Sequence, residues 1–429
     1  MDSSLLEPIV SLPVSNMAEN LIGSEIIKLA GEVKEKIKKG EQIYNLTIGD
    51  FNPKLFPIPT ELKNQIITAY KNDETNYPAA NGIEELRQAV SRFLHIRAGL
   101  EYHADQILIS GGARPLIYAI YQTILDPEDT VVFPVPSWNN NHYSHLSRSK
   151  AIFIETTPEN HFMPAAEDLK KHISEANLIA LCSPLNPTGT VFSQQGLEQI
   201  CDLIVEENKK RADFKKPVYL LFDQIYWTLT HGTTQHFDPV SLNPAMKNYT
   251  IFVDGISKAF AATGVRVGWA FGPSKIINKM RSILSHVGAW SPKAEQVATA
   301  AFLNNDDAID KYLDSFKLNI EKRLNGFYKG FTSLKESGYP VDAIAPQAAI
   351  YLTVKIDLRG KTTSEGNTLD TMEAVTQYIL DKAKVALVPF YAFGANKNSP
   401  WYRLSVGTVK IEDVEHIINN IKTAIDQLK

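Results

Sequence analysis

The middle of the chain alternates short, continuous apolar runs with longer segments in which apolar residues recur at helical spacing. The apolar runs occupy residues 106–110, 130–134, 151–155, 178–182, 218–222, 250–254 and 267–271. Several of them are apolar at every position, a pattern typical of strands that are covered on both faces. Helical spacing separates some of these runs, at residues 114–125, 166–175 and 194–211. This rhythm predicts an α/β layered domain.

The two ends of the chain follow a different pattern. Near the N-terminus the spacing predicts a helix that stops at Gly40, a short strand and two more helices, over residues 19–39, 43–48, 60–71 and 83–98. Residues 274–336 predict one short and one long helix. The C-terminal part mixes predicted strands and helices, at residues 350–356, 384–388 and 402–406 for strands and 369–383 and 411–428 for helices. This mixture favours a smaller α+β domain.

These patterns divide the chain into three segments. A chain of 429 residues is long enough for two or three domains, and its 44% apolar content is sufficient for a large core. We expect an N-terminal arm that completes part of a small domain (1–55), a large domain (56–312) and a C-terminal small domain (313–429). The boundary near 310–320 is the least defined, because a long helix could cross it.

Composition and charge narrow the functional classes. The formal net charge of −4 favours neither nucleic acid nor an anionic membrane as a partner. No apolar run approaches the ~20 residues that cross a bilayer, and the N-terminus lacks the basic start and apolar core of a signal peptide. The two cysteines, Cys182 and Cys201, are too few for a disulfide framework, so we expect a cytoplasmic protein. His142 and His145 have no cysteine or acidic partner at metal-ligand spacing, which predicts loop histidines and no metal site.

One lysine stands in an informative setting. Residues Thr250 to Lys258 have the pattern of a β-branched strand that ends in a small-residue turn, and Arg266 follows eight residues after the lysine. A primary amine can hold an aldehyde as an imine, and burial favours its neutral, reactive form. An arginine fork can bind a phosphate through two hydrogen bonds. Taken alone, Lys258 could be a solvated lysine and Arg266 could form a surface ion pair. Their shared setting favours a site in which the lysine forms an imine and the arginine binds a phosphate.

Other polar residues fall at or near the ends of predicted strands. Asp223 ends an apolar run, with Tyr226 three residues on; a buried carboxylate there needs a partner such as a protonated pyridine nitrogen, and a turn-capping aspartate is the alternative. Asn186 lies in the segment Ser-Pro-Leu-Asn-Pro-Thr-Gly at 183–189. The segment Ser-Gly-Gly-Ala-Arg at 110–114 joins a strand to a helix, where backbone N–H groups attract an anion.

Two further residues suit a flat, anionic ligand. Trp138 could lie against an aromatic ring, with a core tryptophan as the alternative. Arg403, on a predicted strand, could hold a carboxylate in bidentate fashion, although by itself it is an ordinary strand arginine. A lysine, an arginine, an aspartate and groups for a ring hydroxyl together match the needs of pyridoxal 5'-phosphate.

Three motifs, in this order and spacing, resemble those of the class I/II aminotransferases, the fold-type-I family that uses pyridoxal phosphate: Asn-Pro-Thr-Gly at 186–189, Asp-x-x-Tyr at 223–226 and Ser-Lys…Arg at 257–266. The resemblance runs from about residue 22 to the C-terminus. It implies a large, cofactor-binding α/β domain with a mostly parallel seven-stranded sheet, plus a smaller α+β domain. It also implies a cis peptide bond at Asn186–Pro187, with Val135–Pro136 as a second candidate.

The resemblance implies a role for each matching residue in cofactor binding. Lys258 would form the Schiff base with the cofactor and shuttle the proton, and Asp223 would pair with the ring nitrogen. Asn186 and Tyr226 would hydrogen-bond the ring oxygen, and Trp138 would stack on the ring face. The phosphate would be held by Gly112, Ala113, Arg114 and Arg266.

The resemblance also implies how substrate and partner subunit are bound. Arg403 would hold the substrate α-carboxylate, together with Asn186 and the backbone near Gly49. Tyr77 looks like the tyrosine that reaches the phosphate of a neighbouring subunit, which implies a homodimer with shared active sites.

Three positions depart from the family pattern. Gly255 stands where many members have a serine, and Gln224 replaces a glutamate that often follows the aspartate. The segment 285–293 lacks an arginine that some members use for a second substrate carboxylate, which puts dicarboxylate specificity in doubt. The side-chain pocket could instead be shaped by Lys293, Trp290 or His286.

The resulting hypothesis is an aminotransferase that moves the amino group of an L-amino acid to a 2-oxo acid through Lys258. A β-elimination lyase or a cyclase on the same scaffold is a second hypothesis, which the sequence does not separate from the first. A non-enzymatic ligand-sensing module is a third; only about 20 residues precede the resemblance, too few for a DNA-binding winged helix.

Overall fold

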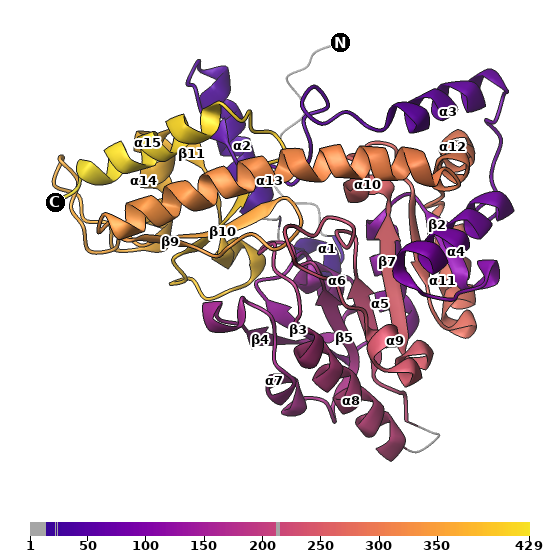
Figure 1. Ribbon diagram of the computed structural model, residues 1–429. Coiled ribbons are helices and arrows are strands. Elements are labelled where there is room, and N and C mark those ends of the chain that lie inside the picture. Colours follow the sequence, from indigo (N-terminus) through magenta and orange to yellow (C-terminus); the bar gives the residue numbers. More distant parts are fainter. Residues whose placement is uncertain (1–13, 22, 24, 212–214) are drawn as a thin grey trace, which may run out of the picture.

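A seven-stranded sheet forms the centre of the larger part of the molecule (Figure 1). The structure is a computed structural model that describes residues 14–21, 23, 25–211 and 215–429. One strand runs antiparallel to both of its neighbours, and the other pairs are parallel, so the prediction of a mostly parallel seven-stranded sheet is confirmed. The order is β2 (Ile107–Ser110), the antiparallel β8 (Gly268–Phe271), β7 (Thr250–Gly255), β6 (Tyr219–Asp223), β5 (Ala176–Cys182), β3 (Thr130–Val135) and β4 (Lys150–Glu155).

Helices cover both faces of this sheet, which explains the continuously apolar strands. In β7, Ile251 and Val253 face one core and Phe252 faces the other. The first core is formed with α5 (Ala113–Ile124) and α11 (Ser274–Val287). The second core is formed with α4 (Glu84–Ala98), α8 (Gln194–Lys210) and α12 (Lys293–Leu303), against which α3 (Thr60–Lys71) packs. Short helices complete this part: α6 (Asn140–Ser147), α7 (Ala166–Lys170) and α9 (Pro239–Leu242).

A separate hydrophobic core lies under a smaller, antiparallel four-stranded sheet. Its order is β12 (Val388–Pro389), β13 (Trp401–Ser405), β10 (Tyr351–Ile356) and β9 (Val341–Ala343). Two short parallel strands, β1 (Tyr44–Asn45) and β11 (Val385–Ala386), join the N-terminal segment to this region. The helices of the region are α2 (Glu25–Lys38), α14 (Met372–Tyr378) with a π-helical turn at Ile379–Ala383, and α15 (Asp413–Asp426). The short α1 (Asn16–Glu19) precedes them.

One long helix, α13 (Asp306–Glu336), connects the two parts of the molecule (Figure 1). It crosses the predicted boundary at 312/313 without interruption. Its first turn contributes Ala308 and Ile309 to the core of the large sheet, and Phe316 and Ile320 contribute to the core of the small one. The division into three segments stays a prediction. Residues 1–13 of the first segment lie outside the described residues, so the structure does not test the prediction that the N-terminus lacks a signal peptide.

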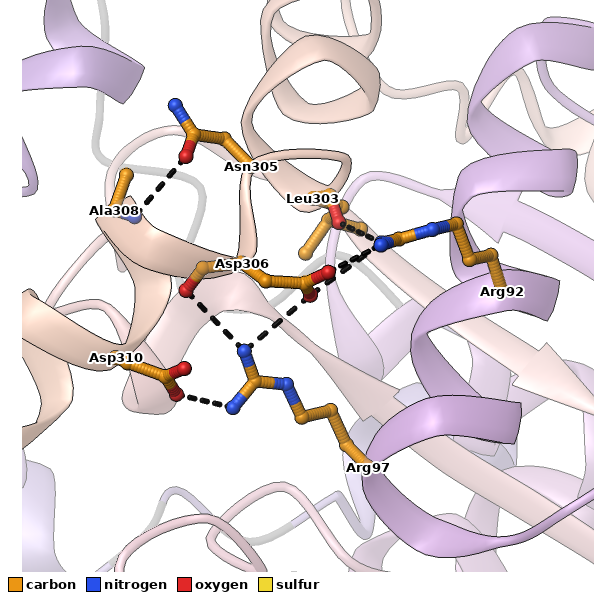
Figure 2. A network of polar contacts seen from close by, with 7 residues as sticks. All are labelled: Arg92, Arg97, Leu303, Asn305, Asp306, Ala308 and Asp310. Carbon is orange, nitrogen blue, oxygen red and sulfur yellow. Dashed lines mark hydrogen bonds and ion pairs between the residues drawn. The ribbon is translucent and has the colours of Figure 1, made fainter.

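Polar contacts hold the start of α13 against α4 (Figure 2). Arg92 of α4 forms an ion pair with Asp306, and Arg97 pairs with both Asp306 and Asp310. Asn305 caps the helix by accepting a hydrogen bond from the backbone N–H of Ala308 at 3.1 Å. Helix start and neighbouring helix are therefore fixed to each other by charge as well as by packing.

Several predicted elements differ from the structure in their extent. Residues 274–336 form three helices rather than two, because Gly288 adopts a left-handed φ of 72° and ends α11. The predicted strand at 384–388 is split into β11 and β12, the helix at 166–175 ends at Lys170, and the strand at 43–48 is reduced to β1. Of the helix predicted at 19–39, the structure has α2 from Glu25; residues 22 and 24 lie outside the described residues.

Two local predictions were wrong. His142 and His145 lie on α6 rather than in a loop, and the His145 Nε2 atom is 2.7 Å from the Met17 carbonyl oxygen. The cis peptide bonds are at Val135–Pro136 and Ser183–Pro184; the Asn186–Pro187 bond is trans, so only the second candidate is confirmed. In the ranges that the structure covers, no helix has the length and apolar character needed to span a membrane.

Candidate active site

A cavity of about 420 Å³ lies where the central parallel strands of the large sheet end. The residues at the ends of β5, β6 and β7 meet there, as expected for ligand sites of open α/β sheets. Cys182, Asp223 and Lys258 form its floor, and Tyr351 and Arg403 reach it from the small sheet. Both parts of the molecule therefore build one site.

Lys258 is the cation at the centre of this cavity. It lies in the single-turn helix α10 (Ile256–Ala259) directly after β7. Its Nζ atom donates a hydrogen bond to the Gly49 carbonyl oxygen at 2.6 Å. Burial lowers the pKa of Lys258 to about 8, Asp50 opposes this shift, and the nearby arginines, among them Arg403, add to it. A solvated lysine at a strand end is thereby excluded.

Asp223 ends β6 and lies at the floor of the same cavity. Its Oδ1 atom accepts a hydrogen bond from the backbone N–H of Ile225 at 3.0 Å. Burial raises its pKa to about 6, while that hydrogen bond and Lys258 act in the opposite direction. A carboxyl group in this state gains from a cationic partner, which a protonated pyridine nitrogen would provide. The chemistry of the residue therefore fits the ring nitrogen of pyridoxal phosphate.

Asn186 and Tyr226 line the cavity on either side of Asp223. The Asn186 Oδ1 atom accepts a hydrogen bond from Arg403 Nη1 at 3.0 Å. The hydroxyl groups of Tyr226 and Tyr351 are 2.6 Å apart, and burial raises the pKa of Tyr226. Asn186, Tyr226 and Asp223 line one cavity, so their hydrogen-bonding groups would be available to the hydroxyl and the nitrogen of one pyridine ring.

The start of α5 forms an anion cradle at one end of the cavity. Gly112 precedes the helix with a left-handed φ of 96°, and a side chain there would collide with the guanidinium group of Arg266. Arg266 itself is held by hydrogen bonds to the carbonyl oxygens of Thr263 at 2.7 Å and Gly111 at 2.6 Å. Ala113 and Arg114 supply the first helical N–H groups, so helix dipole and guanidinium point at the same space. This cradle fits a phosphate.

Trp138 and Arg403 lie in the cavity wall. The guanidinium groups of Arg114 and Arg403 are 5.3 and 6.0 Å from the centre of the Trp138 indole. Arg403 is only 1% exposed, and its Nη2 atom donates to the Thr47 carbonyl oxygen at 2.6 Å. Within the described ranges no carboxylate pairs with it, which leaves its charge for a ligand. Its packing against the Tyr351 ring, at 4.7 Å, fixes its direction.

Two predicted site residues, Tyr77 and Gly112, are not among those that line the cavity; Gly112 directly precedes the lining residue Ala113, whereas Tyr77 does not. Tyr77 is 82% exposed, and its ring is 5.2 Å from that of Trp290. Lys293 is already paired with Glu74 at 2.8 Å, and neither it nor Trp290 or His286 lines the cavity. Within a single chain these residues therefore do not form part of the cavity.

Two cavity residues escaped the sequence analysis. Tyr351 bridges Tyr226 and Arg403, but an aromatic residue in an apolar strand gives no signal that separates it from the core. Asp50 accepts a hydrogen bond from Thr263 Oγ1 at 2.6 Å and acts electrostatically on Lys258. Because Asp50 directly follows Gly49, which was predicted to bind the substrate, the sequence could have indicated that Asp50 lies at the site.

Comparisons with known proteins agree with this arrangement. The family model of class I and II aminotransferases matches residues 41–421. The aspartate aminotransferase of Rhizobium meliloti (strain 1021) is 28% identical over 409 residues, 94% of each chain, and that of Bacillus subtilis (strain 168) is 27% identical over 412 residues, 95% of this chain and 97% of the relative. The crystal structure of the Rhizobium meliloti aspartate aminotransferase superposes with a TM-score of 0.88 at 26% identity, covering 98% of this chain and all of the other.

Proposed function

Because the chain belongs to the class I and II aminotransferase family, and is therefore a pyridoxal-phosphate-dependent aminotransferase, we propose a role for each residue of the cavity in that reaction. The substrates are amino acids and 2-oxo acids. The observation that carries the proposal is that Lys258 lines one cavity together with Asp223, Arg266 and Arg403. An amine, a carboxylate and two arginines are what the ring, phosphate and carboxylate of such a reaction require.

Lys258 is the residue that holds the cofactor and moves the proton. Pyridoxal phosphate, when bound, forms a Schiff base with an amine and withdraws electrons from the α-carbon of the amino acid. Lys258 Nζ, which donates a hydrogen bond to the Gly49 carbonyl oxygen, would be the group that takes the proton from that carbon and returns it. A pKa of about 8 leaves a useful fraction of the amine neutral near neutral pH, as a general base needs.

The surrounding residues fix the ring and the phosphate. Asp223 pairs with the ring nitrogen and keeps it protonated, and Asn186 and Tyr226 hydrogen-bond the ring oxygen. Trp138 covers one face of the ring. The phosphate lies at the start of α5 and is held by Gly112, Ala113, Arg114 and Arg266. The converging cations and N–H groups of that cradle support this assignment.

Arg403 binds the α-carboxylate of the substrate, with Asn186 and Gly49 beside it. Its guanidinium group is buried next to Gly49 and donates a hydrogen bond to Asn186. We propose L-aspartate as the amino donor, because the relatives in Rhizobium and Bacillus are aspartate aminotransferases.

The visible absorption spectrum of the purified protein tests the function directly. With pyridoxal phosphate bound we expect a yellow protein whose visible band disappears on addition of L-aspartate and returns with oxaloacetate. A band that recovers without an oxo acid while ammonia is released would instead indicate β-elimination. A protein that stays colourless with added cofactor would contradict the assignment of Lys258 and Asp223.

The protein is proposed to act as a cytoplasmic homodimer. Tyr77 is exposed in its own chain, as a residue that completes a partner's phosphate site should be. Both cysteines are free, which suits a reducing compartment. Light scattering should give twice the chain mass, and Tyr77→Ala should weaken cofactor binding although Tyr77 lines no cavity of its own chain. A monomer with full activity would contradict the shared site.

A further inference from the structure

A second carboxyl group, Asp254, is buried one strand away from Asp223. Asp223 is the last residue of β6 and pairs with Val253 of β7, so Asp254 follows directly on the neighbouring strand. Asp254 is 2% exposed and does not line the cavity. Burial raises its pKa to about 8, and Asp223 adds to this shift. Because a carboxyl group is costly to bury, its partners indicate what it does there.

The two oxygens of Asp254 contact two different segments of the site. Oδ1 accepts a hydrogen bond from the backbone N–H of Gly255 at 2.7 Å, at the start of the turn that leads to Lys258. Oδ2 accepts a hydrogen bond from Trp227 Nε1 at 2.8 Å. The backbone N–H of Trp227 in turn donates to the Gln224 carbonyl oxygen at 2.9 Å and closes the turn after β6. One carboxyl group therefore bridges the turns after β6 and β7.

On the basis of the proposed function, we propose that Asp254 is a positioning residue of the aminotransferase site. Through the Trp227 indole it fixes the turn that carries Asp223 and Tyr226. Through its other oxygen it fixes the turn that carries Lys258. The ring-nitrogen partner and the reactive amine come from neighbouring strands, and this carboxyl group is a direct hydrogen-bonded link between the two turns.

The remaining contacts of Trp227 explain why this hydrogen bond matters. The indole packs edge-on against Phe93 at 5.8 Å and lies 6.3 Å from the ring of His236. Such contacts bury the ring, but they leave its rotation poorly defined, whereas the Nε1 hydrogen bond has one direction. A displacement of about 1 Å at a reacting group lowers rates by roughly a hundredfold, so a tether of this kind affects chemistry.

The test is a double-mutant cycle on the holoenzyme with Asp254→Ala and Trp227→Phe. Each variant removes one partner of the same hydrogen bond. We expect Trp227→Phe to raise the dissociation constant of pyridoxal phosphate about tenfold, and Asp254→Ala, which also removes the Gly255 hydrogen bond, to raise it at least as much. The double variant should match Asp254→Ala rather than multiply the two effects. The pH midpoint of the visible absorption band should shift in both single variants, which a loss of global stability alone would not produce.

Two further variants separate positioning from stability. Asp254→Asn keeps an acceptor for Trp227 and should retain most of the cofactor affinity. If the alanine variant does not fold, Trp227→Phe alone removes the hydrogen bond and tests the tether. Asp238→Ala is the matched control, because Asp238 is a buried carboxylate that caps α9 through Val240 and Ser241. It should lower the unfolding temperature while cofactor affinity and absorption midpoint stay at the wild-type values.

The outcomes also distinguish this inference from the proposed function. A wild-type protein that binds no pyridoxal phosphate overturns the proposed function, and with it the site that Asp254 would support. A wild-type enzyme that transaminates, combined with Asp254 variants that keep the wild-type dissociation constant and absorption midpoint, overturns the positioning role alone. Effects of Asp254→Ala and Trp227→Phe that multiply in the double variant would contradict the tether between them.

Discussion

Charged residues are paired with opposite charges at the contact between α4 and α13, whereas those in the cavity lack such partners among the described residues. At the α4–α13 contact, Arg92 and Arg97 each face a carboxylate, and their hydrogen bonds hold the pKa of Asp306 below its usual range (Figure 2). In the cavity, Lys258 is buried among cations, and its pKa is lowered to about 8. The first arrangement is complete without a ligand, and the second is not.

This difference shows which charged groups would be stabilised by a bound ligand. A partly exposed ion pair contributes little and needs no further partner. A buried lysine next to Arg403 and Arg266, opposite a carboxyl group such as Asp223, is unfavourable until a ligand with both charges enters. A cofactor with an aldehyde, a ring nitrogen and a phosphate would supply a partner to each of these groups. Clusters with shifted pKa values, rather than clusters with many ion pairs, therefore mark the functional site.

The largest effect should come from removing the amine. Lys258→Ala is expected to lower kcat for transamination by at least about 10⁴-fold, because no other group can both hold the cofactor and move the proton. Rates with L-aspartate and a 2-oxo acid provide the measurement. Lys335→Ala, which breaks the surface ion pair with Asp342, should keep the full rate. A Lys258→Ala protein that retains the wild-type rate would end the assignment.

Removal of the carboxylate should have the next largest effect. Asp223→Asn keeps the shape of the side chain but cannot keep a pyridine nitrogen protonated, so kcat should fall about 10²- to 10³-fold, on the scale of a lost electrostatic partner. The cofactor should still bind and give a visible band. Equal rates in the variant and the wild type would show that Asp223 is a turn-capping residue only.

The unusual pKa of Lys258 predicts a pH-dependent cost to the stability of the cofactor-free protein. With a pKa of about 8 in the folded state and ~10.4 when unfolded, the unfolded state binds more protons between these values, so stability rises with pH across that window. At pH 7 the lysine is charged in both states and carries the full cost. Lys258→Met should therefore stabilise the protein at pH 7 by about 2–3 kcal/mol.

That gain should disappear as the pH approaches the unfolded-state pKa of ~10.4. Urea unfolding of both proteins at pH 7 and pH 10 measures it, and Lys335→Met is the control for a surface lysine, since Lys335 is more than half exposed. A Lys258→Met variant that is no more stable at pH 7, or whose advantage is constant with pH, would mean that Lys258 is not strained by burial.

The smallest effect should come from the ion pairs between α4 and α13. Arg97→Ala removes contacts to Asp306 and Asp310 at the surface and should lower the free energy of unfolding by at most about 1 kcal/mol. Transamination should be unchanged, because the cavity receives no residue from this contact. Arg97→Lys should recover part of the loss. An Arg97→Ala variant with wild-type stability but reduced activity would contradict the view that this contact serves stability and the cavity serves catalysis.

Most of the large sheet could be predicted because several of its strands are apolar at every position and its helices are not. The site was predictable for a similar reason: Asp223 and Lys258 stand out as polar residues at the ends of such strands, which the fold then gathers at one edge. Tyr351 could not be found, since it is one apolar-looking residue among many in β10. Its proximity to Arg403 is created only by the pairing of β10 with β13.

Other features depend on contacts that a single sequence does not reveal. The break between α11 and α12 is caused by the left-handed conformation of Gly288, and helical spacing continues across it. The cis bond lies at Ser183–Pro184 rather than at Asn186–Pro187, and the sequence motif did not indicate this. Tyr77 does not line the cavity of its own chain, so the role proposed for it requires the proposed homodimer.

The central claim is that Lys258 is the amine that holds the cofactor, and chemical trapping tests it most directly. The protein would be loaded with pyridoxal phosphate, reduced with borohydride, digested and examined by mass spectrometry. The account predicts a phosphopyridoxyl group on the peptide that contains Lys258, and none on that peptide when L-aspartate is added before reduction. A modification at another lysine, or none at all, would contradict it.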